Sequence, residues 1–393
     1  MMRILYVVDS LMAGGIESQL VELALGLDRT QFEPTVLSLY GPRARDLHYA
    51  PRLRAAHVPL VLPDLGWTPG DKLRGIVSIV RTAHALQPDV IQAEGYHANL
   101  LTRLAWPFLP RHAQLIGSLR GVHTVKQMRY ERLSHWMCTR IVTNAPHLKA
   151  DLIRRGRVPE SRIVCIPNGI AAERFARPHD PSLRERLAPS ARLVLVSLGR
   201  ISFEKNMHWS VQALGVLKRQ GRLPEGMRLF IVGPPQDPRA QAALDGAIHQ
   251  DDLEAIVTQQ SATDHPEDYY NACDAVLLYS PNEGLPNVAI ESLAAGRPVI
   301  ISAAANAANV IEDGVCGWVV QTGDVAQLGE TISAIGRLPA ITRARMREAC
   351  LERAHFYSIA NLVQRYTTFY QALLPDPEKG LSPPPAAGFP PKR

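Results

Sequence analysis

Short apolar runs alternate with longer amphipathic stretches along most of this chain. Residues 4–8 and 35–39 are two such runs, and residues 17–27 between them carry apolar side chains at helical spacing. Strands that are apolar on both faces and alternate with helices form parallel sheets, which helices cover on both sides. The pattern therefore predicts an α/β fold built from doubly wound parallel sheets.

The alternation is interrupted by residues 171–190, which are rich in Pro, Arg and Ala and show no clear period. We interpret this segment as a linker between a first domain, residues 1–170, and a second domain, residues 191–354. The length of 393 residues and the hydrophobic content of 46 % suffice for two separate cores. A last helix is predicted within residues 355–373, and the Pro-rich residues 374–393 are predicted to be disordered.

Two domains of this kind predict a central cleft, because ligands of open α/β sheets bind outside the carboxyl ends of the strands. Loops at the predicted strand ends hold the residues whose chemistry suits such a site. In the first domain these are Gly14, Gly15, Gly95, His97, Gly121 and His123. In the second domain they are Gly199, Arg200, Lys205, Gly233 and Glu283.

Residues 280–298 lie between two apolar runs and are predicted to be the loop and helix of a βαβ unit. Pro286 suits the first helical position, which places Glu283 in the loop beside the N–H groups of a helix start. Asn287 and Glu291 are four residues apart and share one helix face, so two carboxylates could bracket one ligand. Acidic residues are mostly exposed, so a solvated loop and helix surface is the alternative interpretation.

Arg200 and Lys205 follow a predicted strand of the second domain. An arginine holds two phosphate oxygens in a fork and a lysine adds a mobile point charge, so the pair could neutralise a diphosphate. The chain contains no Asp-x-Asp triplet that would hold a divalent ion against phosphates, and we therefore expect no metal. The alternative is a surface arginine and a lysine paired with Glu204.

The candidates of the first domain are a glycine pair and two histidines. Gly14 and Gly15 form a tight turn that lets the backbone approach a ligand, although the third spaced glycine of a dinucleotide fingerprint is absent. His123 and His97 each follow a predicted strand at its ligand end, where a histidine serves a site or a structural hydrogen bond.

Residues 101–162 form a basic segment with interleaved aromatic residues. Its cations are Arg103, Arg111, Arg120, Lys126, Arg129, Arg132, Arg140, Lys149, Arg154, Arg155, Arg157 and Arg162, against Glu131, Asp151 and Glu160. Trp106, Phe108 and Trp136 lie among them. This composition suits an anionic membrane surface, while the alternative is a solvated face with the aromatics in the core. No nucleic-acid-binding motif accompanies it.

Cysteine usage and the absence of long apolar stretches bear on location. Five cysteines lie far apart, without a metal-binding spacing, which fits a reducing compartment. Asp9 interrupts the first apolar run, which is typical of a strand rather than of a signal peptide. No run approaches the about 20 apolar residues that cross a bilayer. We expect a cytoplasmic protein, and the basic segment allows for peripheral contact with the inner face of the membrane.

The motifs in their order resemble those of one family. Gly14-Gly15, Pro167-Asn-Gly-Ile170, Gly199-Arg-x4-Lys205, Glu283-Gly-Leu-Pro-Asn-Val-x2-Glu291 and the following Ala-x-Gly-x-Pro-Val are similar to motifs of the retaining family 4 glycosyltransferases. The resemblance extends over residues 3–371. It implies the GT-B fold, in which two Rossmann-like domains face a central cleft and the last helix crosses back to the first domain.

The resemblance also implies roles for the candidate residues. In the second domain, Arg200 and Lys205 would hold a diphosphate, Glu291 the ribose, and Glu283 with the amides of Gly284, Leu285 and Asn287 the donor sugar. In the first domain, Gly15 would lie near the phosphates, His123 near the reacting carbon of the sugar, and the acceptor beside Gly14 and His97. Backbone near residues 260–263 would meet the base.

The expected function is transfer of a sugar from a nucleotide-diphosphate-sugar to a lipid-linked or polysaccharide acceptor in cell-surface glycan biosynthesis, with retention and without metal or other cofactor. The alternatives are an epimerase or phosphorylase on the same fold, and an inactive nucleotide-sugar-binding or membrane-scaffold subunit. The loop at 303–309 motivates the last alternative, since Ala303-Ala-Ala-Asn-Ala-Ala-Asn309 stands where the family often has Gly-Gly-x-x-Glu.

Overall fold

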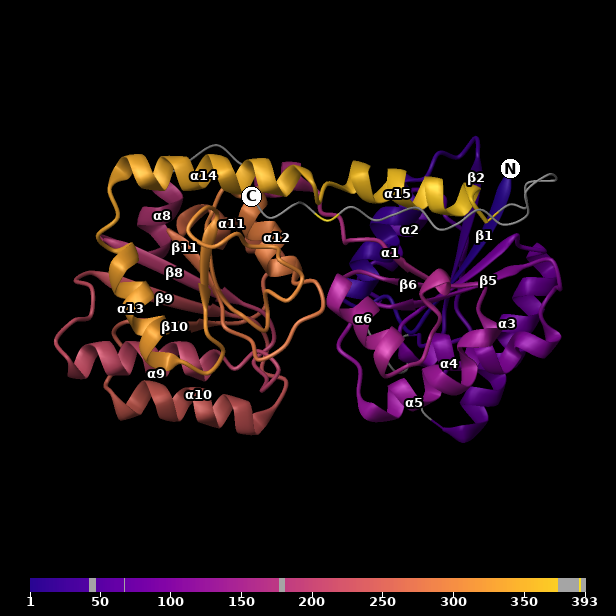
Figure 1. Cartoon of the computed structure of the whole chain (residues 1–393), viewed down its shortest axis with the longest axis horizontal. Coiled ribbons are helices and arrows are strands. Elements are labelled where there is room, and N and C mark those ends of the chain that lie inside the picture. The colour runs from indigo at the N-terminus through magenta and orange to yellow at the C-terminus, as the bar shows by residue number, and fades with distance from the viewer. Residues whose placement is uncertain (42–46, 67, 177–180, 374–388, 390–393) are drawn as a thin grey trace. The chain divides into compact units, whose positions relative to one another are not determined.

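The computed structural model describes residues 1–41, 47–66, 68–176, 181–373 and 389. The chain divides into two compact units (Figure 1). Unit 1 consists of Met1–Gly169 together with Ile359–Phe389, and unit 2 consists of Ile170–Ser358. The last helix of the chain thus belongs to the same unit as the first strand.

Unit 1 is built on a seven-stranded sheet with the order β3-β2-β1-β4-β5-β6-β7, and each pair of neighbours is parallel. The strands are β1 (Met2–Val8), β2 (Phe32–Ser38), β3 (Leu60–Val61), β4 (Val90–Glu94), β5 (Gln114–Leu119), β6 (Arg140–Thr143) and β7 (Ile163–Cys165). The strand order reverses between β1 and β4. At such a switch point the two flanking loops diverge and leave room for a ligand.

Helices cover both faces of this sheet. One face packs on α1 (Gly15–Gly26), α2 (Ala50–Ala55) and α15 (Ile359–Gln371). The other packs on α3 (Pro69–Leu86), α4 (Tyr96–Ala105), α5 (Val125–Ser134) and α6 (Pro146–Arg154). Short 3-10 turns are η1 (Trp106–Phe108), η2 (His135–Met137) and η3 (Glu160–Arg162). Side chains alternate between the two faces of β1, so that Tyr6 joins the first core and Val7 the second.

A buried polar network fastens α15 to the sheet of unit 1. Arg120, just after β5, donates to Glu94 at 3.0 Å and to the Tyr366 hydroxyl at 2.5 Å. Tyr370, one helical turn further on, donates to Gln92 at 2.8 Å. A buried ion pair needs such additional hydrogen bonds, because the attraction alone does not offset the loss of hydration. The network therefore ties the loop after β5 to the last helix.

Unit 2 is built on a six-stranded parallel sheet with the order β10-β9-β8-β11-β12-β13. Its strands are β8 (Leu193–Leu198), β9 (Met227–Val232), β10 (Val257–Gln260), β11 (Ala275–Leu278), β12 (Val299–Ser302) and β13 (Gly317–Val320). α9 (Met207–Arg219), α10 (Pro238–Gln250) and α13 (Val325–Ile335) pack on one face. α11 (Pro266–Ala272), α12 (Asn287–Ala294) and α14 (Ala340–His355) complete the unit, with α14 against α12. The switch point lies between β8 and β11.

The α/β fold with two doubly wound parallel sheets is confirmed. One detail differs from the prediction: the segment 171–190 contains α7 (Ala172–Phe175) and α8 (Pro181–Leu187) instead of an irregular linker. Phe175 is buried, and Arg184 pairs with Asp274 at 2.8 Å, so both helices are part of unit 2. The sequence lacked a clear period here because the helices are only four and seven residues long. The predicted disorder of 374–393 falls almost entirely outside the described residues.

Candidate functional site

Two candidate residues of unit 2 meet at its switch point. Glu283 lies in the loop between β11 and α12, and Lys205 lies in the loop between β8 and α9. The Lys205 ammonium donates to the Glu283 carboxylate at 2.5 Å, with the side chains only 19 % and 14 % exposed. Because β8 and β11 are neighbours, their carboxyl ends bring the two loops together. This geometry places a cation and a carboxylate at the edge where a ligand of unit 2 is expected.

Two glycines allow the backbones to approach closely at this edge. Gly199 follows β8 with φ +137°, and Gly233 follows β9 with φ +153°. A Cβ atom at Gly233 would overlap the carbonyl oxygen of Gly199, which is backbone and cannot turn away. Only glycine fits at position 233 without moving the loop after β8 that carries Lys205.

Arg200, the second predicted cation, is placed differently. Its guanidinium pairs with Glu204 at 3.4 Å, and its side chain is 52 % exposed. The structure thus gives Arg200 the kind of surface pairing that was the alternative interpretation, while Lys205 pairs with Glu283 and not with Glu204. An exposed pair of this kind contributes about 0–1 kcal/mol, so Arg200 can exchange Glu204 for another anion at little cost.

The start of α12 differs slightly from the prediction. Pro286 is the residue before the helix, with φ −76° and ψ 108°, and Asn287 is the first helical residue. Gly284 precedes the buried Leu285 in the same loop. The four residues Gly284–Asn287 therefore form the turn in which the predicted donor-sugar contacts lie.

Glu291 lies one turn into α12 and is half-buried. Its carboxylate accepts a hydrogen bond from the buried Tyr270 hydroxyl at 2.6 Å. Burial raises the pKa of the Glu291 carboxyl, while the hydrogen bond from Tyr270 opposes that rise. The structure therefore shows a carboxylate held in place from α11, a partner that sequence spacing did not indicate.

Backbone N–H groups of the loop at residues 303–309 donate hydrogen bonds to other parts of the protein. Ala303 donates to the carbonyl of Val320 at 2.8 Å, and Ala304 donates to the Thr322 hydroxyl at 2.9 Å. The Asn306 side chain closes the turn through two hydrogen bonds of 2.9 Å to the backbone of Ile311. These amides are engaged within the protein, which argues against phosphate contacts from this part of the loop.

In unit 1 the carboxyl edge of the sheet contains a carboxylate that sequence reasoning missed. Asp9, directly after β1, accepts hydrogen bonds from the N–H groups of His97 at 3.3 Å and Ala98 at 2.6 Å. Its side chain caps α4, and a Cβ atom at Gly95, where φ is +101°, would collide with it. Burial raises the pKa of Asp9. The signal in the sequence that could have indicated Asp9 is its place as a polar residue directly after a buried strand.

His97 is a neighbour of this cap. Its Nδ1 atom lies 3.8 Å from the Asp9 carboxylate, and its ring lies edge-on to Tyr40 and Tyr96. Gly14 is the residue before α1, and Gly15 is the first residue of that helix. The predicted acceptor-side residues therefore stand at the starts of α1 and α4, the helices that follow the two strands at the switch point of unit 1.

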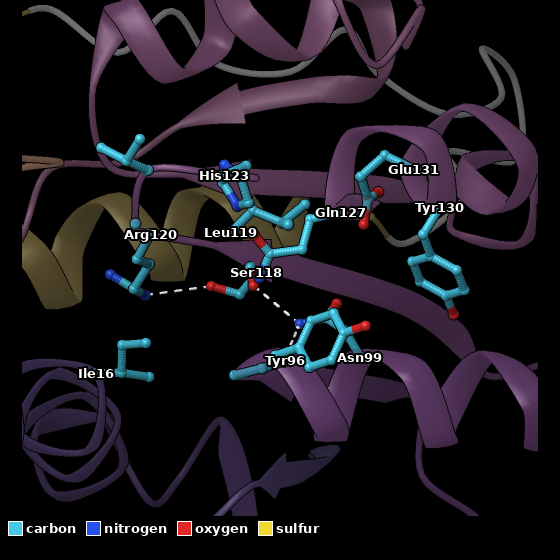
Figure 2. A pocket seen from close by; sticks show the side chains of 13 residues that line it. Ile16, Tyr96, Asn99, Ser118, Leu119, Arg120, His123, Gln127, Tyr130 and Glu131 are labelled. Carbon is cyan, nitrogen blue, oxygen red and sulfur yellow. Dashed lines mark hydrogen bonds between the residues drawn. The ribbon is translucent and has the colours of Figure 1, made fainter. Parts of the chain in front are cut away.

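His123 lines a cavity of about 140 Å³ within unit 1 (Figure 2). Its side chain is buried, and its Nδ1 atom has no hydrogen-bond partner among the described residues. Burial lowers the pKa of His123 from 6.5 to about 4, so the imidazole is neutral near pH 7. The cavity is lined by Ile16, Gly95, Tyr96, Asn99, Ser118, Leu119, Arg120, Gly121, Val122, His123, Gln127, Tyr130 and Glu131.

The basic segment of unit 1 is less uniform than its sequence indicates. Arg103 is buried and pairs with the buried Glu131 at 2.9 Å, and Arg120 is buried with Glu94. These two arginines must be removed from the predicted basic face, since their charges are neutralised in the interior. Trp106, Phe108 and Trp136 are exposed and not part of the core.

No group of three or more His, Cys, Asp or Glu residues that could hold a metal ion occurs within the described part of the chain. The five cysteines are unpaired and buried. No helix among residues whose structure is described has the length and apolar character to span a bilayer.

Two parallel-sheet units, each with chemically active loops at its switch point, define an α/β protein of the GT-B type. Family models agree: "Glycosyltransferase Family 4" matches residues 13–174 and "Glycosyl transferases group 1" matches residues 180–353. The chain belongs to this family of glycosyltransferases and is an enzyme of that class.

Two bacterial glycosyltransferases and one solved structure illustrate what the chain is similar to. The chain is 22 % identical to the capsular polysaccharide biosynthesis glycosyltransferase CapM of Staphylococcus aureus, over 67 % of this chain and 71 % of CapM. It is 27 % identical to the lipopolysaccharide 1,2-N-acetylglucosaminetransferase of Salmonella typhimurium, over 58 % of this chain and 60 % of that protein. The structure of Anabaena Alr3699/HepE in complex with UDP and glucose has a TM-score of 0.82 at 20 % identity, over 95 % of this chain and all of that one.

Proposed function

We propose that this enzyme transfers a sugar from a nucleotide-diphosphate-sugar to a lipid-linked or polysaccharide acceptor, with retention and without a metal ion. The observation that carries the proposal is the 2.5 Å pair of Lys205 and Glu283 at the switch point of unit 2. It lies within the part of the chain that matches the group 1 glycosyltransferases. The UDP and glucose bound to the Anabaena protein, whose fold is similar, support a donor of this class.

The chemistry of the leaving group explains why the cation matters. When the bond between the sugar and the phosphate breaks, negative charge grows on the departing diphosphate. A fixed cation in a partly water-excluded site stabilises that charge more than it stabilises the bound donor, and this difference accelerates the reaction. Lys205 supplies such a cation, and Arg200 supplies a second one once its exposed contact with Glu204 is exchanged for phosphate.

The carboxylates have the complementary task of holding hydroxyl groups. Glu283 accepts hydrogen bonds from hydroxyl groups of the donor sugar, beside the backbone of Gly284, Leu285 and Asn287. Glu291, held by Tyr270, accepts hydrogen bonds from the ribose hydroxyls. His123 is neutral near pH 7, so it can accept a hydrogen bond at one ring nitrogen and donate at the other. Gly14 and His97 would flank the acceptor, and Gly15 would lie near the donor phosphates.

The relatives support the proposed class of acceptor. CapM acts in capsular polysaccharide biosynthesis and the Salmonella protein in lipopolysaccharide, which supports a glycan or lipid-linked acceptor in cell-surface biosynthesis. Buried unpaired cysteines fit a cytoplasmic location, and we place the protein at the inner face of the membrane.

The test is product analysis with nucleotide-diphosphate-sugars, with and without a preparation of lipid-linked acceptors and with EDTA present. Sugar should appear on the acceptor in EDTA, and K205A and E283A should abolish transfer while the far-ultraviolet circular dichroism is unchanged. Conversion of the donor without acceptor would favour an epimerase, and phosphate-dependent release of sugar 1-phosphate would favour a phosphorylase. Donor binding without breakdown in the presence of acceptor would indicate an inactive subunit.

A further inference from the structure

We propose that unit 1 docks on an anionic membrane through one defined surface, the α4–α5 surface. Its apolar members are Leu104, Trp106, Phe108, Leu133 and Trp136, and its cationic members are Arg111, Arg129 and Arg132. This inference rests on the proposed function only for its biological sense, because binding to lipid can be measured without any sugar transfer.

The apolar members of this surface are largely exposed to water. They are between 40 % and 74 % exposed, although side chains of this kind usually bury most of their area. The rings of Trp106 and Trp136 lie 5.2 Å apart, which joins the end of α4 to the end of α5. The Trp136 indole N–H donates to the carbonyl of Leu133 at 2.9 Å, so this ring is oriented by the protein. Exposed aromatic and aliphatic side chains together suit the boundary between headgroups and acyl chains.

The exposed charges on α4, on α5 and on the turns that follow them have a single sign. Between Tyr96 and Ala150, all of which the structure describes, the only acidic residue is Glu131. Glu131 is buried and paired with Arg103, so it gives no negative charge to the surface. Lys126, Arg129 and Arg132 are exposed on α5. Outside this window, the exposed carboxylate Glu160 of η3 pairs with Lys149 at 2.9 Å. The cations of the surface are attracted to anionic headgroups, at about 1 kcal/mol per cation.

The helix directions relate this surface to the candidate site. α4 and α5 begin at the carboxyl edge of the sheet, next to Gly95 and His123, and end at the opposite edge, next to Trp106 and Trp136. Each helix has ten residues, which corresponds to roughly 15 Å. With the ends of both helices at the bilayer, the loops of unit 1 stand about one helix length above it. That height suits an acceptor whose glycan part rises from a lipid anchor.

A second copy of this chain is the competing occupant. In a two-fold contact each surface faces its own copy, so the cations on α5 would approach cations, and neither α4 nor α5 has an exposed carboxylate to compensate them. A symmetrical dimer through this face therefore brings like charges together, whereas an anionic membrane attracts the same cations. This difference decides for the membrane.

The test is co-sedimentation of the full chain with vesicles of phosphatidylcholine alone or mixed with phosphatidylglycerol. We expect binding to the mixed vesicles that weakens with added salt. R129E/R132E should reduce the affinity at least about 25-fold, since each cation contributes about 5-fold. L133S/F108S should reduce binding even at low salt, since the apolar contact is lost.

The matched controls carry the same changes elsewhere on the chain. R54E/R345E reverses two exposed cations on α2 and α14, and I341S/V315S removes two exposed apolar side chains of unit 2. Both should bind vesicles like the parent, apart from a uniform effect of net charge in R54E/R345E that is much smaller than the loss in R129E/R132E. Donor binding, measured without vesicles, should be unchanged in all four variants.

Three results would overturn the inference. They are no binding to anionic vesicles at low salt, equal losses in R129E/R132E and R54E/R345E, and a dimer in light scattering that L133S/F108S dissociates. If the parent protein binds no donor, the proposed function is wrong, whereas the membrane inference is unaffected. The two failures can therefore be told apart.

Discussion

Replacing Lys205 with methionine, which has a similar length but no charge, removes the cation proposed to stabilise the leaving diphosphate. Loss of one preplaced charge-stabilising donor costs about 10²–10³ in kcat, and we expect a loss of this size. The effect on stability is separate. Lys205 and Glu283 are mostly buried, so loss of the ion pair between them should cost about 2 kcal/mol, between the values for exposed and fully buried pairs. For a unit of this size the melting temperature should fall by about 4–8 °C.

The double variant K205M/E283Q separates catalysis from stability. Neutralising Glu283 removes the charge that Lys205 offsets in the parent, so a large part of the lost stability should return while kcat stays low. The assays are thermal unfolding followed by circular dichroism and initial rates of sugar transfer at saturating donor. A double variant that recovers parental activity together with its stability would refute the reasoning, because the pair would then be only structural.

Three further changes probe the scaffold of the site. Y366F removes the hydroxyl that accepts a 2.5 Å hydrogen bond from the buried Arg120 guanidinium, and urea unfolding should show a loss of about 1.5–3 kcal/mol; a loss below the error of the fit would contradict the network. In G233A the added methyl group overlaps the backbone carbonyl oxygen of Gly199, and the variant should lose about 3 kcal/mol or more of unfolding free energy. G246A on α10 is the control, because a Cβ there meets nothing within 4 Å, and it should be neutral or stabilising. Equal effects of the two variants would disprove the steric argument. Burial lowers the pKa of His123 from 6.5 to about 4, so the unfolded chain binds a proton before the folded chain as the pH falls. The free energy of unfolding should therefore drop by up to about 3 kcal/mol between these two pH values. H123N should lose less stability over the same range, and identical pH profiles would contradict the prediction.

The sequence predicted the meeting of Lys205 and Glu283 for a physical reason. Each residue follows a buried parallel strand, and carboxyl ends of neighbouring strands lie at one edge of a sheet. The sequence did not contain the direction of the Arg200 side chain, because an exposed arginine has many rotamers of similar energy, and a local carboxylate such as Glu204 selects among them.

The other differences concern burial and long-range partners. Arg103 and Arg120 were assigned to a basic face, although each is neutralised inside unit 1 by a carboxylate at least 26 residues away. Nothing local distinguishes a buried arginine from an exposed one, because its partner comes from another element. For the same reason the cap formed by Asp9 on α4, 89 positions from Ala98, was not predicted.

The most direct test of the central claim is a thermal-shift titration of the parent protein and K205M with a panel of nucleotide-diphosphate-sugars. A ligand that binds only the folded state at 100 times its Kd stabilises it by about 2.7 kcal/mol, which for a unit of this size raises the melting temperature by about 5–10 °C. We expect at least one donor to produce this shift in the parent and a clearly smaller shift in K205M, because Lys205 contributes to donor binding although it stabilises the leaving diphosphate more. No shift with any donor, or equal shifts in both proteins, would contradict a donor site at Lys205 and Glu283.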